Sequence, residues 1–148
     1  MTRRVVVMLG VHDTVTIWNR HRNKETKKDE WVLHVVEGCS WECEIEATTT
    51  DKGAVVGGSY SVMIAEHEDY RDYLSWKQMG PEERARYFTL NAGDLIALGE
   101  IATEISGVEP YRMSDVQSEL LPNAFIVKAF ADESQKHKLG RHYMVKGV

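Results

Sequence analysis

The first clear pattern of polar and apolar positions predicts a β-hairpin. Residues 14–19 (TVTIWN) alternate between polar and apolar side chains, which is typical of a strand with one buried face. Residues 31–36 (WVLHVV) resume a strand rich in β-branched residues. We expect the two stretches to pair, with the polar residues 20–30 forming an unusually long connection at the tip.

A second hairpin is predicted directly after the first. In residues 41–47, four alternating positions are apolar and the three positions between them are glutamates. Residues 51–53 (DKG) suit a turn, and residues 54–64 suit the returning strand, with a bulge or a kink expected at Gly57 and Gly58. Consecutive hairpins form a meander, so we expect a mainly β fold, a small β-barrel or a sandwich.

Residues 89–100 (TLNAGDLIALGE) combine a polar turn with a short apolar run. Gly93 permits a backbone conformation that other residues resist, and Asp94 can hydrogen-bond within its own turn. The run 95–98 is too short for a stable helix and is closed by Gly99, so it predicts a strand buried on both sides. We interpret Gly93, Asp94 and Gly99 as a structural turn.

Two short helical segments interrupt the β pattern. Residues 69–86 carry aromatic residues at roughly helical spacing and a second start at Pro81, where proline fits the first helical position. Ser114 and Gln117 fit a capping box, and Pro122 ends that short helix. Residues 101–105, 123–130 and 141–146 predict further strands. We expect one domain over residues 1–148, with residues 1–13 as a candidate N-terminal arm.

Composition and charge narrow the classes of function. The net charge of −5 argues against a general nucleic-acid binder that relies on overall positive potential. No run of about eighteen apolar residues is present, so we expect no membrane span. The apolar run at residues 5–9 is too short for a secretory leader, and no small-residue cleavage site follows it.

The predicted tip at residues 20–30 is locally basic, with five Lys or Arg against three acidic residues. A solvated loop would explain this composition. The functional interpretation is a finger that touches DNA phosphates in a channel or a partner subunit. Its candidate residues are Arg20, His21, Arg22, Lys24, Lys27 and Lys28.

The sequence predicts no catalytic, cofactor-binding or metal-binding residues. The six histidines lack the spacing that would place two ligands on one helical face. Cys39, Cys43 and His34 can be assembled into a metal site on paper, but two reduced thiols are the simpler interpretation. The carboxylates of residues 66–69 and Asp115 carry no motif that distinguishes a nuclease from chance pairing.

Three of the four tryptophans lie on the predicted strands. Trp18 and Trp31 sit near the ends of the first hairpin and are expected to form a cross-strand pair. Core packing would explain Trp18, Trp31 and Trp41. The alternative is that they anchor a subunit interface, where tryptophan is enriched.

Three segments together resemble a family of small head-completion proteins of tailed bacteriophages and prophages of Firmicutes. They are VTIWNR (15–20) with WVLHVVEGCSW (31–41), then YSVMI (60–64) with the tyrosine-rich segment after it, and RYFTLNAGDLIALGE (86–100). The resemblance covers roughly residues 14–147. This chain has Asn-Ala-Gly-Asp where many relatives have Pro-Gly-Asp, so its turn is expected to differ slightly.

The resemblance implies a head-closure, or stopper, protein of the phage neck with a small β-barrel core. Such proteins form a homo-oligomeric ring below the portal and adaptor, meet tail-completion proteins, and retain packaged DNA. It therefore implies localisation in the virion after assembly in the host cytoplasm, no enzymatic activity, no cofactor and no membrane partner.

Three further expectations follow for the assembly. A ring needs two different complementary surfaces on each subunit, and the terminal strands at residues 5–9 and 142–145 are candidates for strand addition to a neighbour. A tail-terminator or tail-completion subunit would fit the same pattern. From another class, a small β-barrel nucleic-acid-binding module would stack bases on Trp18 and Trp31 beside the basic tip.

Overall fold

A computed structural model describes residues 12–50, 53–132 and 142–148, and at residues 45–50, 53–58 and 132 it describes the backbone only. Most of the predicted N-terminal arm, its strand at residues 5–9, and residues 51–52 of the second turn lie outside the described residues. No described helix is long and apolar enough to cross a bilayer.

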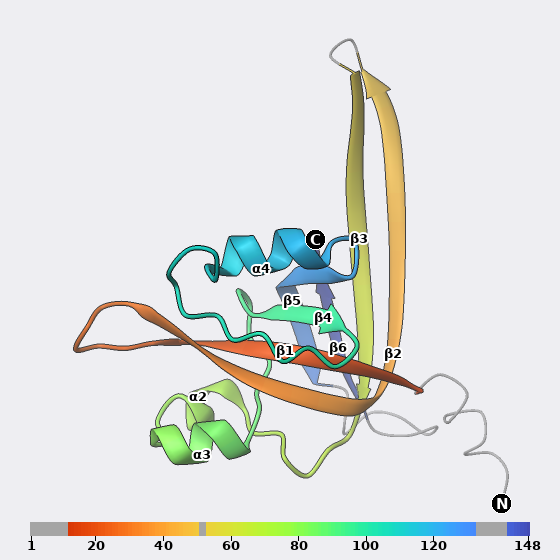
Figure 1. Ribbon diagram of the computed structural model, residues 1–148. Coiled ribbons are helices and arrows are strands. Elements are labelled where there is room, and N and C mark those ends of the chain that lie inside the picture. The colour runs from red at the N-terminus through yellow and green to blue at the C-terminus, as the bar shows by residue number, and fades with distance from the viewer. Residues whose placement is uncertain (1–11, 51–52, 133–141) are drawn as a thin grey trace, which may run out of the picture.

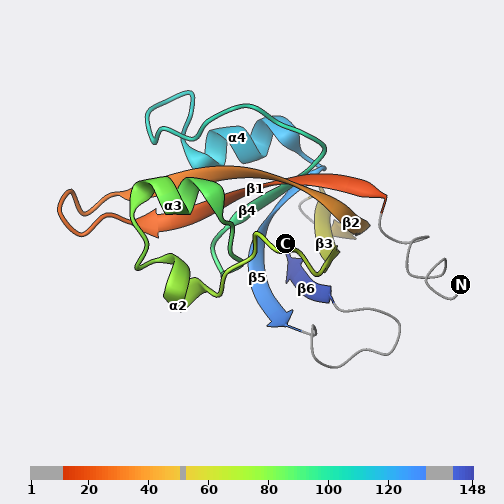
Figure 2. The same ribbon diagram turned by 90° about the horizontal axis from the view of Figure 1, so that it is seen from below.

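Six antiparallel strands close into a barrel in the order β1-β2-β3-β6-β5-β4, which confirms the predicted mainly β fold (Figures 1 and 2). The strands are β1 (Asp13–Arg22), β2 (Asp29–Thr50), β3 (Gly53–Ala65), β4 (Leu95–Leu98), β5 (Ala124–Asp132) and β6 (His142–Gly147). Closure joins β1 to β4, with Val15 opposite Leu98. The predicted donor strand at residues 142–145 is part of β6, which pairs with both β3 and β5. It therefore offers no free edge to a neighbour, and that prediction is wrong.

The first hairpin is longer, and its connection shorter, than the sequence pattern indicated. The ladder between β1 and β2 continues through Arg20↔Trp31 and His21↔Glu30 to Arg22↔Asp29, so the connection comprises residues 23–28. Cross-strand pairs of polar side chains extend the ladder, since His21 faces Glu30 and the charged Arg22 faces Asp29 at 3.5 Å. The prediction of a loop over residues 20–30 is therefore wrong in its bounds, because residues 20–22 and 29–30 belong to the strands.

The second hairpin projects far from the barrel (Figure 1). Pairing of β2 with β1 ends at Cys39, and pairing with β3 runs from Cys39 to Thr50. Gly38 has a positive φ of 77° and lies where β2 leaves β1, so it redirects the strand instead of ending it. The register passes through Gly57 and Gly58 without a shift, so of the expected bulge or kink the bulge is absent.

Three short helices lie among the described residues: α2 (Tyr73–Trp76), α3 (Pro81–Arg86) and α4 (Met113–Leu120). The helices α2 and α3 both fall in the predicted segment 69–86. Pro81 opens α3, as expected. The N-terminus of α4 is held by Asp115 and Arg112, not by Ser114 and Gln117 as predicted. The Asp115 carboxylate accepts hydrogen bonds from the Arg112 backbone N–H at 3.0 Å and from its guanidinium at 2.9 Å, which a glutamine further along the helix cannot match.

Residues 101–105, predicted as a strand, have no regular structure. They cross the outside of β1, where the Thr16 hydroxyl accepts a hydrogen bond from the Ile101 N–H at 2.8 Å. Side-chain hydrogen bonds thus satisfy this segment in place of a ladder.

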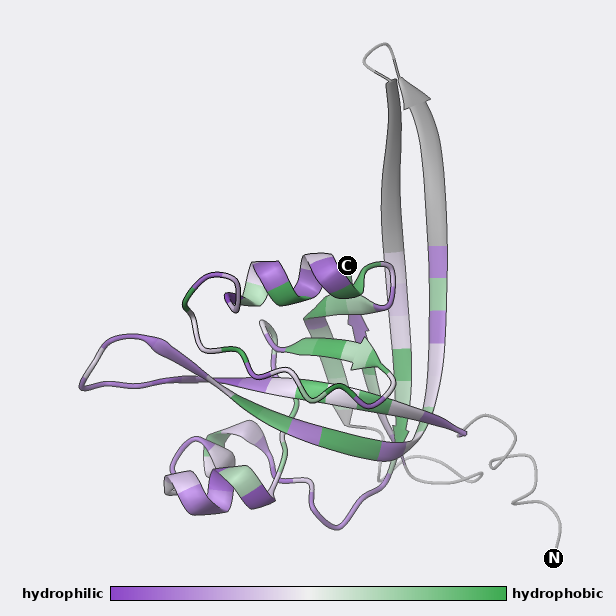
Figure 3. Ribbon diagram, viewed as in Figure 1, coloured by the Kyte–Doolittle hydropathy of each residue, from purple (hydrophilic) through white to green (hydrophobic). Residues whose placement is uncertain are grey.

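The buried apolar residues form two clusters separated by the β1 and β4 wall of the barrel. Ile17 and Ile96 belong to the cluster inside the barrel, whereas Trp18 and Leu95 belong to an outer cluster that includes Val116 of α4. Because alternate residues of β4 enter different clusters, the prediction that this strand is buried on both sides is confirmed. Figure 3 shows hydrophobic colour along these strands and hydrophilic colour at the β1–β2 tip.

Candidate functional site

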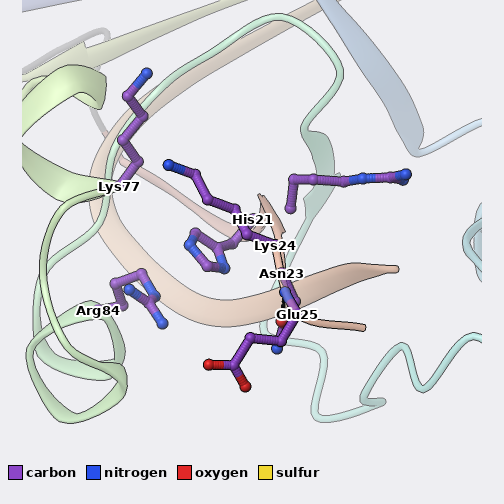
Figure 4. A pocket seen from close by; sticks show the side chains of 7 residues that line it. His21, Asn23, Lys24, Glu25, Lys77 and Arg84 are labelled. Carbon is purple, nitrogen blue, oxygen red and sulfur yellow. Dashed lines mark hydrogen bonds between the residues drawn. The ribbon is translucent and has the colours of Figure 1, made fainter. Parts of the chain in front are cut away.

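A basic pocket of about 370 Å³ lies between the tip of the β1–β2 hairpin and the helices α2 and α3 (Figure 4). We call it the basic pocket and define it by its lining residues. These are His21, Arg22, Asn23, Lys24, Glu25, Lys77 and Arg84. Three of the six predicted tip residues line it, and the segment of α2 and α3 contributes Lys77 and Arg84.

The hairpin side of the pocket is held in shape by Asn23. Its side-chain oxygen accepts hydrogen bonds from the N–H groups of Glu25 at 2.9 Å and Thr26 at 3.1 Å. Its amide group donates to Glu30 at 3.1 Å, and its backbone pairs with Lys27 and Lys28. An asparagine that bonds its own turn fixes the loop backbone locally. The loop therefore presents Lys24 from a defined position.

The helical side is held by Trp76 and Arg84. The Trp76 indole donates to the Tyr87 carbonyl at 2.7 Å, which ties α2 to the end of α3, and its ring meets the His21 ring edge-on at 6.0 Å. Arg84 is only 8% exposed, and its guanidinium donates to the Met79 carbonyl. A buried arginine usually has an anionic partner.

The charges of the basic pocket are only partly neutralised. Arg22 lies 3.5 Å from Asp29, and His21 lies 3.4 Å from Glu30. Over the described ranges of the chain, no carboxylate lies within 4.0 Å of Lys24, Lys77 or Arg84. Lys77 instead lies over the Tyr73 ring, with its nitrogen 5.6 Å from the ring centroid. Three cations facing one hollow can bind an anionic group, either a carboxylate or a phosphate.

The six basic-tip candidates do not act as one group. His21, Arg22 and Lys24 line the pocket, whereas Lys27 and Lys28 are exposed on the loop outside it. Arg20 lies elsewhere, because its guanidinium packs on Gly93, where an added Cβ would lie 2.8 Å from Cζ. The sequence missed Arg84 and Lys77, since nothing in a short helical turn distinguishes a pocket arginine from a solvated one.

The predicted turn at Gly93 and Asp94 joins three segments of the barrel. Gly93 has φ +98°, as expected for a glycine turn, and Gly99 has φ +94°. The buried Asp94 carboxylate accepts hydrogen bonds from the N–H of Asn91, the N–H of Arg20 and the amide of Asn19, each at 2.9 Å. Burial raises the pKa of Asp94 to about 6, against these hydrogen bonds, which lower it.

Asn19 is a structural residue that the sequence pattern missed. It is fully buried, donates to the Thr89 carbonyl at 2.7 Å and accepts from the Thr89 N–H at 3.1 Å. Together with its bond to Asp94, it links β1 to the segment before β4. The sequence did not predict this role, because Asn19 is a polar residue at the end of an alternating strand, where a solvent-exposed side chain is equally expected.

The candidate interface tryptophans differ in exposure. Trp18 is fully buried against α4, and its indole donates to the Thr103 carbonyl at 2.9 Å, so it cannot anchor a partner or stack a base. Trp18 faces Leu33 across the ladder, and Trp31 faces Arg20, so the predicted direct pair is wrong by two positions. Trp31 and Trp41 are partly buried against the outer and inner clusters.

The residues considered for a metal site are Cys39, Cys43 and His34. The described part of the chain contains no group of three His, Cys, Asp or Glu residues that could hold a metal ion. Burial raises the pKa of the Cys39 thiol to about 12, and the thiol donates to the Val36 carbonyl at 3.6 Å. Burial lowers the pKa of His34 to about 4.

The chain belongs to a family of unknown function, DUF6751, whose profile matches residues 11–148. Neither a search of curated proteins nor a search of solved structures found a match.

Proposed function

For this member of the DUF6751 family, we propose a structural role in the neck of a tailed bacteriophage, as a subunit of the head-closure ring. The ring would lie between the portal or adaptor and the tail-completion proteins and would retain packaged DNA. The resemblance in residues 15–20, 31–41, 60–64 and 86–100 motivates this proposal.

The observation that supports it best is the projecting part of the β2–β3 hairpin. The last pairing of β3 with β6 on this side is at Tyr60, opposite Cys43 of β2. Beyond this point β2 continues for seven residues to Thr50, which corresponds to about 23 Å of strand. Within the described chain, neither strand of this part pairs with a third strand.

A two-stranded ribbon without a sheet around it is marginally stable in water. Contact with another molecule would supply the missing support. The closed barrel, in contrast, needs no partner strand, because every barrel strand is paired on both sides. A self-contained body with one long projecting arm is the shape expected of a subunit that is built into an assembly.

Inactivation of the reading frame in the phage or prophage that encodes it tests this role. We expect particles that package DNA and then lose it, together with complete but unattached tails, when lysates are examined by electron microscopy. Expression of the intact chain from a plasmid should restore joined particles. Stable DNA-filled heads joined to tails in the absence of the chain would refute the proposal.

The same geometry also fits a tail-terminator or tail-completion subunit, and the same micrographs separate the two roles. Loss of a terminator should yield tails of irregular length, whereas heads should keep their DNA. The nucleic-acid-binding module loses one of its two proposed stacking residues, because Trp18 is fully buried.

A further inference from the structure

The projecting β2–β3 hairpin carries an acidic face that begins at the barrel. Glu42 and Glu44 are exposed, whereas Trp41 and Cys43, which alternate with them, pack against the core of the barrel. Residues 38–50 and 53–65 contain three glutamates and no other charged residue. Lys146 is in register with Glu42 but lies two strands away, on β6, beside Ser61 of β3, which faces Glu42. We call Glu42 and Glu44 the acidic face.

The acidic face and the basic pocket lie at separate places on one subunit. Figure 1 shows the two hairpins leaving the barrel in different directions, with α2 and α3 beside the β1–β2 hairpin. The acidic face therefore does not fill the basic pocket of its own subunit. Each surface is complementary in charge to the other, and the cations Lys24, Lys77 and Arg84 lack carboxylate partners among the described residues.

We propose that the basic pocket receives the acidic face of the β2–β3 hairpin of a second copy of this chain. The Glu42 and Glu44 carboxylates of one copy would pair with Lys24 and Lys77 of the next, beside the buried guanidinium of Arg84. Two different patches meet in this contact, so it is heterologous, and repetition of such a contact closes into a ring or continues as a filament. The inference rests on the proposed function, since it names the contact between neighbours in the proposed ring.

DNA phosphate is the competing occupant of the pocket. The net charge of −5 and the exposed glutamates of the hairpin disfavour approach of a polyanion to the molecule as a whole. The hairpin of a second copy brings carboxylates on an extended, already formed strand. The observations therefore favour a protein partner, and binding of DNA is an outcome of the test.

Charge reversal of each surface tests the contact. One variant carries Glu42→Lys and Glu44→Lys, and the other carries Lys24→Glu and Lys77→Glu; all four positions are exposed. Self-association is measured by sedimentation velocity over a range of protein and salt concentrations. We expect each variant to associate at least about tenfold more weakly than the wild type, because like charges then meet at the contact.

Mixing the two variants provides the decisive measurement. In an equimolar mixture, the basic hairpin of the first variant can meet the acidic pocket of the second. The unchanged hairpin of the second variant can likewise meet the unchanged pocket of the first. Association should therefore return to within about threefold of the wild type. Misfolded variants could not be rescued in this way. Glu104→Lys with Glu119→Lys, and separately Lys128→Glu, reverse exposed charges elsewhere and should leave association unchanged.

Four results would overturn the inference. They are a wild type that stays monomeric at every concentration, variants that associate like the wild type, a mixture that fails to recover, and a pocket variant that loses salt-dependent affinity for duplex DNA while its self-association is unchanged. None of them refutes the neck role, which the particle micrographs test separately.

Discussion

At the scale of single residues, Gly147 is the most closely packed of the described glycines. It lies in β6 between Tyr60 of β3 and Val127 of β5. A Cβ at this position would overlap the carbonyl oxygen of Ile126 and the ring of Phe125. The close approach of neighbouring backbones therefore requires the absence of a side chain.

We expect Gly147→Ala to lower the free energy of unfolding by about 2–3 kcal/mol, because a paired backbone cannot move aside as a flexible side chain can. Gly80→Ala is the matched control, since no atom lies within 4 Å of its added Cβ and its φ of −74° suits alanine. Urea unfolding followed by tryptophan fluorescence measures both changes. Equal stability of the two variants would contradict the assignment of Gly147.

Two buried ionisable residues give opposite dependences of stability on pH. Burial lowers the pKa of His34 to about 4, although the Arg84 backbone and Asp69 oppose the effect. Between about pH 4 and 6.5 the unfolded chain holds the His34 proton and the folded chain does not, so stability rises with pH. The pKa of Asp94 is raised from 3.8 to about 6. Between these two pH values the folded chain holds the Asp94 proton and the unfolded chain does not, so stability falls as pH rises toward 6.

These two effects should nearly cancel in the wild type between about pH 4 and 6. Each of the two pKa shifts changes the free energy of unfolding by about 3 kcal/mol across its pH window. We expect His34→Gln to lose stability as pH rises through this window, and Asp94→Asn to gain stability as pH rises. The slope of unfolding free energy against pH, measured in urea at several pH values, checks both signs. Parallel slopes in the two variants would contradict the account.

At the scale of elements, the described members of both apolar clusters lie on the barrel, its loops and α4. They reach no further than Cys43 in β2 and begin at Tyr60 in β3. A protein in which residues 45–58 are replaced by Asn-Gly should therefore keep its fold. Its midpoint of thermal unfolding should lie within about 2–4 °C of the wild type, the shift that about 1 kcal/mol produces in a domain of about 150 residues.

The shortened protein still carries the acidic face, because Glu42 faces Ser61 of β3, which also pairs with β6 of the barrel. We expect it to show a wild-type circular dichroism spectrum in the β region and to keep its self-association. Collapse of the barrel after this deletion would show that the hairpin is part of the folding unit rather than an arm.

The sequence predicted the elements better than their connections. Alternation in residues 14–19 and 41–47 identified strands correctly because period two is a local property. It could not show that Trp18 faces α4 while Ile17 faces the barrel interior, because both sides of β1 are buried. The sequence also could not show that Gly38, with its positive φ, redirects one long strand, because a glycine at such a position can equally end a strand.

The candidate site was predicted only on its hairpin side. Local charge identified His21, Arg22 and Lys24, but the other wall depends on tertiary packing, which places Arg84 beside residues more than fifty positions earlier in the chain. The buried position of Asn19 likewise depends on a segment seventy residues away. Long-range contacts of this kind leave no periodic trace in the sequence.

At the scale of the whole molecule, closure of the barrel between β1 and β4 determines the order in which the chain can fold. The bond from the Thr16 hydroxyl to the Gly99 carbonyl joins residues 83 positions apart, whereas β1, β2 and β3 pair through neighbouring hairpins. Closing a long segment costs more chain entropy than closing a short one, so contacts between distant residues tend to form late. Hydrogen exchange with pulse labelling during refolding should therefore protect amides of the β2–β3 ladder before those of β4. A chain emerging from the ribosome could pair β4 with β1 once residues near 98 become available, but its wall would close only after β5 and β6 join β4 to β3.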